Sequence, residues 1–85
     1  MTKDNNEIKW QCRRGLWELD IMLAPFAEYD YPALSSKHKQ DFRDLISHED
    51  VDLLNWLVSR IKTDIEKDQE IINQIILAHE NRLTT

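Results

Sequence analysis

The sequence has one glycine, Gly15, where average usage would place about six in a chain of 85 residues. It also has one cysteine, Cys12, and two prolines. A single cysteine excludes an internal disulfide framework and fits a reducing compartment. With one glycine, neither a glycine-rich phosphate loop nor a dinucleotide-binding fingerprint can form. The classes of enzyme that depend on such loops are therefore not expected.

Long apolar runs and clusters of positive charge are also missing. No segment approaches the roughly 18 to 20 apolar residues that cross a bilayer, and residues 1–7 lack the apolar core of a signal peptide. The formal net charge is −5, and the bases are scattered, so the chain lacks the basic patch with which proteins bind nucleic acid or anionic membranes. We expect a cytoplasmic monomer with protein partners, without membrane insertion and without nucleic acid.

What is present is a series of segments with helical spacing. Chains of this size form one core, so residues 1–85 are expected to be a single domain, with residues 1–5 and 83–85 frayed. A first helix would begin at a cap, Asn5 or Asn6, and end before Gly15 at the left-handed stop position. A second would bury the stripe Leu16, Leu19, Leu23 and Phe26, be kinked or interrupted at Pro25, and lead into a loop over 29–34.

Three further helices follow in the second half of the chain. Ser35 or Ser36 caps a third helix, with Phe42, Leu45 and Ile46 inward, and Asp50 caps a fourth. Only residues 47–49 separate these two helices, which predicts a tight helical hairpin. Trp56 is expected in the core, and a fifth helix begins at Asp64. The prediction is an all-α fold, a small five-helix bundle.

No catalytic or metal-binding pattern can be assembled. The three histidines lie on separate segments, and none shows a metal-ligand spacing. The stretch from His48 to Asp52 lacks the turn glycine and the bidentate glutamate of a calcium loop. Cys12 is expected to be a buried small hydrophobe, although Arg13 and Arg14 beside it could lower a thiol pKa. We expect neither an enzyme, nor a metal site, nor a cofactor of its own.

The segment around Gly15 has two interpretations. In the first, Gly15 only ends a helix, with Arg13 and Arg14 complementing its dipole and Glu18 opening the next helix. In the second, the bare glycine lets another protein approach, between the polar groups of Arg14 and Glu18. Trp17 lies off the apolar stripe, so it is either an exposed anchor for a partner or packed against a neighbouring helix.

The pattern Arg14-Gly15-x-x-Glu18 resembles the RGxxE signature of the SdhE (YgfY) family, which are FAD assembly factors for succinate dehydrogenase. The resemblance continues through Trp10 to Ile21, Pro25 to Tyr31 and Asp50 to Leu57. It implies a five-helix bundle without catalytic groups. Such a protein binds the flavoprotein subunit of succinate dehydrogenase, and often of fumarate reductase, and promotes covalent attachment of FAD to a histidine of that client.

The resemblance also implies which residues contact the client. Gly15 would be the point of close approach, flanked by Arg14 and Glu18, with Arg13 and Asp20 as secondary candidates. Trp17 occupies a variable position of the motif and is added from its expected exposure. The alternative is an antitoxin-type binding module, since some relatives are described as antitoxins. Identification of the main cellular partner, a flavoprotein subunit or a small membrane toxin, separates the two.

Overall fold

The structure is a computed structural model that describes residues 8, 10–12 and 14–83. These residues are all-helical and contain no strand. Their elements are α2 (Trp17–Pro25), the π-helix η1 (Phe26–Asp30), the 3-10 helix η2 (Tyr31–Ala33), α3 (Ser36–Ile46), α4 (Asp50–Leu53), the π-helix η3 (Leu54–Val58) and α5 (Glu66–Leu83). The all-α class is confirmed. The count of five helices is not, because much of the expected first helix lies outside the described residues, as do residues 1–5 and 84–85.

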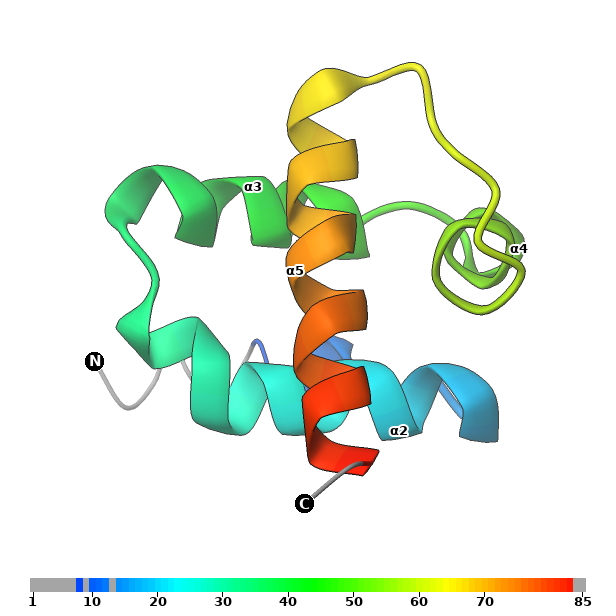
Figure 1. The fold of residues 1–85 in the computed structure, drawn as a ribbon, viewed down its shortest axis with the longest axis horizontal. Helices are drawn as coiled ribbons and strands as arrows, with labels where there is room; N and C mark the ends of the chain where they lie inside the picture. The colour runs from blue at the N-terminus through cyan, green and yellow to red at the C-terminus, as the bar shows by residue number, and fades with distance from the viewer. Residues whose placement is uncertain (1–7, 9, 13, 84–85) are drawn as a thin grey trace.

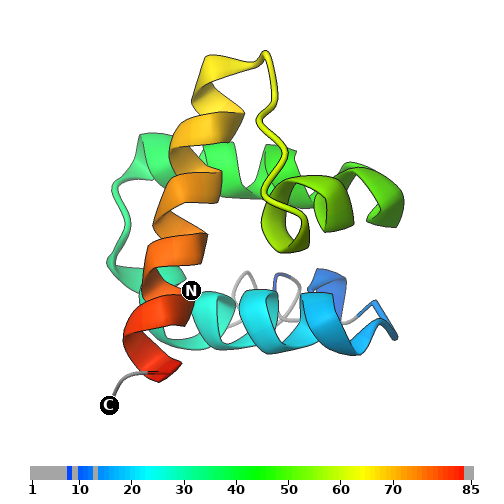
Figure 2. The ribbon, with the colours of Figure 1, turned by 45° about the vertical axis from the view of Figure 1, so that its right-hand side comes forward.

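Two helical arms and one crossing helix organise the molecule. Figure 1 shows α2 with η1 as the lower arm and α3 as the upper arm, running in opposite directions, with α5 crossing both. Figure 2, turned by 45°, shows α4 and η3 near the same end of the molecule as the start of α2. The segment from Asp50 to Val58 packs mainly against α2 and α5. The expected tight hairpin of α3 and α4 is therefore wrong, because Leu53 and Leu57 bury their side chains in the common core.

Pro25 interrupts the α-helix, as expected, but the chain remains helical after it. It ends α2, and the chain continues in the wider π-helical turn of η1, in which the N–H of Tyr31 donates to the carbonyl of Phe26. The loop expected over 29–34 is thus largely helical. The reason is burial: the rings of Phe26 and Tyr31 lie 5.1 and 5.5 Å from that of Phe42 on α3. Packing of three aromatic rings outweighs the preference of a proline-containing segment for a loop.

Several local predictions hold and two need correction. The Oγ of Ser35 accepts from the N–H of His38 at 3.2 Å, which confirms the helix cap of α3. The inward stripes of α2 and α3 pack in or against the core, as predicted. α5 begins at Glu66, two residues later than predicted, and residues 59–65 form an irregular connection with bends at residues 59 and 64. Trp56 is half-buried at the core's edge, where its ring stands edge-on to that of His48, 4.9 Å away.

Candidate functional site

We call residues 14–20 the RGxxE corner, the turn at which the chain enters α2. Gly15 has φ +74°, the left-handed conformation predicted for it. It is exposed, and a Cβ built on it would meet no atom within 4 Å. Glycine is therefore favoured here for its backbone angle, and no contact with the other described residues would obstruct a Cβ at this position.

Arg14 is not the free surface group that the sequence predicts. Its side chain is only 15% exposed and lies against the end of α3. One terminal nitrogen donates to the carbonyl of Ile46, and the other donates to the carbonyl of His48 at 3.3 Å and to Asp50 at 3.1 Å. The last carbonyls of a helix have no partners within the helix, and a cation there also complements the helix dipole. Arg14 thus caps α3 from a distant part of the chain.

Asp20 completes the inner side of the corner. Its Oδ1 accepts from the backbone N–H of Arg14 at 2.9 Å, across the turn that Gly15 makes. It lies in the first turn of α2, where a carboxylate is favoured by the helix dipole. Leu16 caps α2 without a side-chain hydrogen bond. The contact from Asp20 therefore ties the incoming chain to the helix.

The outer side of the corner carries an aromatic and an acidic side chain. Trp17 is 72% exposed, which answers the open question of its position, and Glu18 is exposed as predicted. Trp10, 76% exposed, lies before the corner. Arg13, the other secondary candidate, lies outside the described residues. The motif places Gly15, Trp17 and Glu18 at the surface and turns Arg14 and Asp20 inward.

A shallow hollow of about 470 Å³ lies beside the corner. Its lining residues are Trp10, Gln11, Arg14, Arg43, Ile46, Ser47 and Asp50. The corner brings no reactive group to it: Cys12 is fully buried, and burial raises the pKa of its thiol to about 12. Within residues 8, 10–12 and 14–83, no group of three or more His, Cys, Asp or Glu side chains is placed to hold a metal ion. The arrangement is suited to binding.

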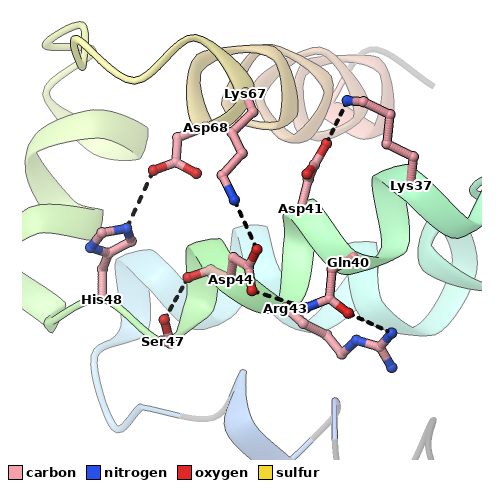
Figure 3. A network of polar contacts seen from close by, with 9 residues as sticks. All are labelled: Lys37, Gln40, Asp41, Arg43, Asp44, Ser47, His48, Lys67 and Asp68. Atoms are coloured by element: carbon pink, nitrogen blue, oxygen red, sulfur yellow. Dashed lines mark hydrogen bonds and ion pairs between the residues drawn. The ribbon is translucent and has the colours of Figure 1, made fainter.

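Polar side-chain contacts join α3 and the following linker, residues 47–49, to α5. Lys67 donates to Asp44 at 2.9 Å, and this hydrogen bond lowers the pKa of the Asp44 carboxyl (Figure 3). Nearby, Nε2 of His48 lies 3.3 Å from Oδ2 of Asp68, which is 2% exposed. The linker, whose His48 carbonyl accepts a hydrogen bond from Arg14, is therefore attached to α5 as well.

Asp50 and His48 are partners of the corner that the sequence did not reveal. Asp50 was expected as the cap of the fourth helix, but Glu49 holds that position and Asp50 pairs with Arg14 instead. The backbone carbonyls of Ile46 and His48 carry no sequence signal at all.

None of the helices in the described part of the chain has the length and apolar character needed to span a bilayer.

Comparisons with known proteins agree on one family. The profile described as "Flavinator of succinate dehydrogenase" matches residues 6–79. The chain is 50% identical over 60 residues to the FAD assembly factor SdhE of Yersinia pseudotuberculosis, covering 69% of this chain and 68% of that protein. It is 39% identical over 83 residues to the protein of the same name from a Serratia species, covering 96% and 94% of the two chains. The corresponding protein of Idiomarina loihiensis is 40% identical over 70 residues, 82% of this chain and 78% of that protein. The chain therefore belongs to the family of flavinators of succinate dehydrogenase.

Proposed function

We propose that this chain binds the flavoprotein subunit of succinate dehydrogenase through the outer side of the RGxxE corner and promotes covalent attachment of FAD to that subunit. The flavoprotein subunit of fumarate reductase would be a second client. The protein acts as a cytoplasmic monomer and holds no cofactor of its own. FAD is the group attached to the client.

The observation that carries the proposal is the uncovered backbone at Gly15. This position is exposed, and the space outside it is empty to 4 Å. Trp17 stands two residues away with 72% of its surface exposed, and tryptophan is among the residues most enriched at binding hot spots. A client segment could lie close to the glycine backbone and be held by Trp17 and Glu18.

The inner side of the corner supplies rigidity. Arg14 is held by two carbonyls and a carboxylate of the segment 46–50, and its N–H by Asp20. A surface whose conformation is set before binding loses little freedom on association, which favours affinity. In this proposal Arg14 and Asp20 act by holding Gly15, Trp17 and Glu18 in place.

The mechanism is selection of a client conformation. Bond formation between a client histidine and the flavin requires the two groups in near-attack geometry, and a binding partner can favour that geometry without supplying a nucleophile or base. A protein that binds the competent conformation more tightly shifts the client toward it. The family name and the non-reactive state of Cys12 agree with this role.

The test is Gly15→Arg in cells that lack the chromosomal gene. Left-handed φ costs a non-glycine residue roughly 1 kcal/mol, and a Cβ at this exposed position meets no atom of the other described residues within 4 Å, so the variant should fold. The arginine would, however, fill the space needed by the client. We expect cooperative thermal unfolding at a slightly lower temperature, and loss of in-gel flavin fluorescence from the flavoprotein subunit.

The matched control is Asn73→Arg, which adds the same side chain at an exposed position of α5. Both variants are compared with wild type at equal levels of soluble protein. Normal fluorescence with Gly15→Arg would overturn the proposed docking site. Co-purification of a small membrane protein as the main partner, without a flavoprotein, would favour the antitoxin role instead.

A further inference from the structure

We infer that the pair His48–Asp68 positions the RGxxE corner for client binding, an inference that rests on the proposed function. The pair lies outside the RGxxE motif, on the α3–α4 linker and on the first turns of α5. Figure 3 shows the imidazole of His48 pointing from the linker to the carboxylate of Asp68 on α5.

His48 contacts two different parts of the molecule, one through its side chain and the other through its backbone carbonyl. Through its side chain, Nε2 lies 3.3 Å from Asp68 Oδ2, and the ring meets the edge of Trp56. Through its backbone, its carbonyl accepts from Arg14. The imidazole is thus fixed by α5 and η3, while the peptide of the same residue holds the arginine of the motif. A displacement of the ring would move the carbonyl that Arg14 needs.

Three acceptors must converge on Arg14 for its guanidinium to be held. They are the carbonyls of Ile46 and His48 and the carboxylate of Asp50, on alternate residues of one short segment. Only the His48 carbonyl lies on the linker between α3 and α4, whereas Ile46 ends α3 and Asp50 begins α4. A change in the linker's backbone angles would turn the His48 carbonyl and move Asp50 relative to Ile46, so the three acceptors would no longer converge. The contact with Asp68 is the side-chain link that ties this linker to the crossing helix α5.

The burial of Asp68 argues that the pair has a positional role. The carboxylate is 2% exposed, and its Oδ1 has no hydrogen-bond partner among the described residues. A buried carboxylate with an unsatisfied oxygen is costly, and apolar residues of similar volume often stabilise a core equally well. What an apolar residue could not do is attract the imidazole and fix the direction of the His48 peptide.

The second buried acid, Asp41, provides a matched control. It is 6% exposed, lies on α3, and is paired with Lys37 at 2.9 Å, one helical turn earlier. Both acids are buried on helices that pack together, but Asp41 pairs with Lys37 of its own helix, whereas Asp68 pairs with the linker. Asp41→Asn should therefore lower stability without disturbing the corner.

The experiment compares four variants by two readouts. His48→Leu removes the imidazole, Asp68→Asn removes the carboxylate charge and so weakens the pair, His48→Gln keeps an N–H donor near the place of Nε2, and Asp41→Asn is the control. The first readout is the NMR signal of the Arg14 Nε–H and of the Gly15 amide in the isolated, folded protein. The second is the affinity for the purified flavoprotein subunit, measured by calorimetry.

We expect His48→Leu and Asp68→Asn to shift both signals and to weaken client binding about fivefold, within the range seen for residues that couple distant sites. His48→Gln should restore both readouts, and Asp41→Asn should lower the melting temperature only. Unchanged Arg14 and Gly15 signals in the two pair variants would overturn the inference, as would equal effects of Asp41→Asn. If His48→Leu does not fold, Asp68→Asn carries the same test.

Failure of the proposed function is distinguishable from failure of this inference. The NMR readout uses the protein without a client, so it reports the position of Arg14 whether or not the client is correctly identified. A Gly15→Arg protein that still supports FAD attachment would remove the docking role and leave the coupling of His48 to Arg14 intact. A Gly15→Arg protein that fails, beside pair variants that bind normally, would remove the inference alone.

Discussion

Arg14 and Glu18 lie four residues apart and both carry a charge, yet they belong to different halves of the RGxxE corner. The inner half, Arg14 and Asp20, makes its contacts within the protein. The outer half consists of Gly15, Trp17 and Glu18, which are all exposed to solvent. A motif can therefore combine residues that build a surface with residues that use it. Substitutions in the two halves should fail in different ways: by loss of stability in the inner half and by loss of binding in the outer half.

The largest expected effect on stability is that of Arg14→Ala. The substitution removes contacts of a guanidinium that is 15% exposed with two backbone carbonyls and Asp50. Hydrogen bonds to charged groups contribute about 1.5 to 3 kcal/mol, so the free energy of unfolding should fall by about 2 kcal/mol. Urea denaturation measures it. A change below about 0.5 kcal/mol, typical of surface positions, would place Arg14 in the outer half.

Trp17→Ala should show the opposite behaviour. Truncation of a hot-spot tryptophan weakens binding by about 2 kcal/mol or more, whereas its 72% exposure predicts little change in stability. Calorimetric titration against the flavoprotein subunit measures the first quantity and thermal unfolding the second. The control is Leu77→Ala, which removes an exposed apolar side chain from α5. Equal losses of affinity in both variants would mean that Trp17 is not a specific anchor.

Glu18→Ala should give a smaller loss of the same kind. An exposed carboxylate at the edge of an interface is expected to contribute about 1 kcal/mol to client binding and less than about 0.5 kcal/mol to stability. Glu66→Ala is a close match, because Glu66 is also an exposed acid in the first turn of a helix. If the two variants bind the client equally well, Glu18 serves only the dipole of α2.

The effect that is smallest at neutral pH concerns Cys12, which precedes the corner and is fully buried. Burial raises the pKa of its thiol from 9.0 to about 12. The unfolded chain therefore releases this proton near pH 9 while the folded protein retains it, so stability should fall as the pH rises from 9 toward 12. Comparison with Cys12→Ala isolates this contribution from those of other groups. The same slope of stability against pH in both proteins would contradict the assignment.

The local features of the corner were predictable because they depend on neighbours in the chain. A lone glycine between two helical segments indicates a left-handed residue, and φ of Gly15 is +74°. The spacing of Leu19, Leu23 and Phe26 defines the buried face of α2, and it leaves Trp17 outside. Ser35 before a helical segment is a cap for the same reason. Each of these inferences involves residues only a few positions apart.

The error over residues 29–34 shows where local rules stop. A segment that contains Pro32 favours a loop, but the chain continues in helical turns through η1 and η2. The deciding contacts are those of Phe26 and Tyr31 with Phe42, which come from another helix. Burial of these rings depends on the placement of α3, and no spacing within residues 25–34 encodes it.

By itself, the sequence determined the all-α class, the left-handed turn at Gly15 and the buried stripe of α2, because helical periodicity and capping act over one or two turns. Only the tertiary structure decided the direction of Arg14. Its acceptors lie 32 to 36 residues later in the chain, and two of them are backbone carbonyls. The linker between α3 and α4, which carries the carbonyl of His48, is held by Asp68 from yet another helix. Every residue has a backbone carbonyl, so which one meets a guanidinium is set by the packing of helices.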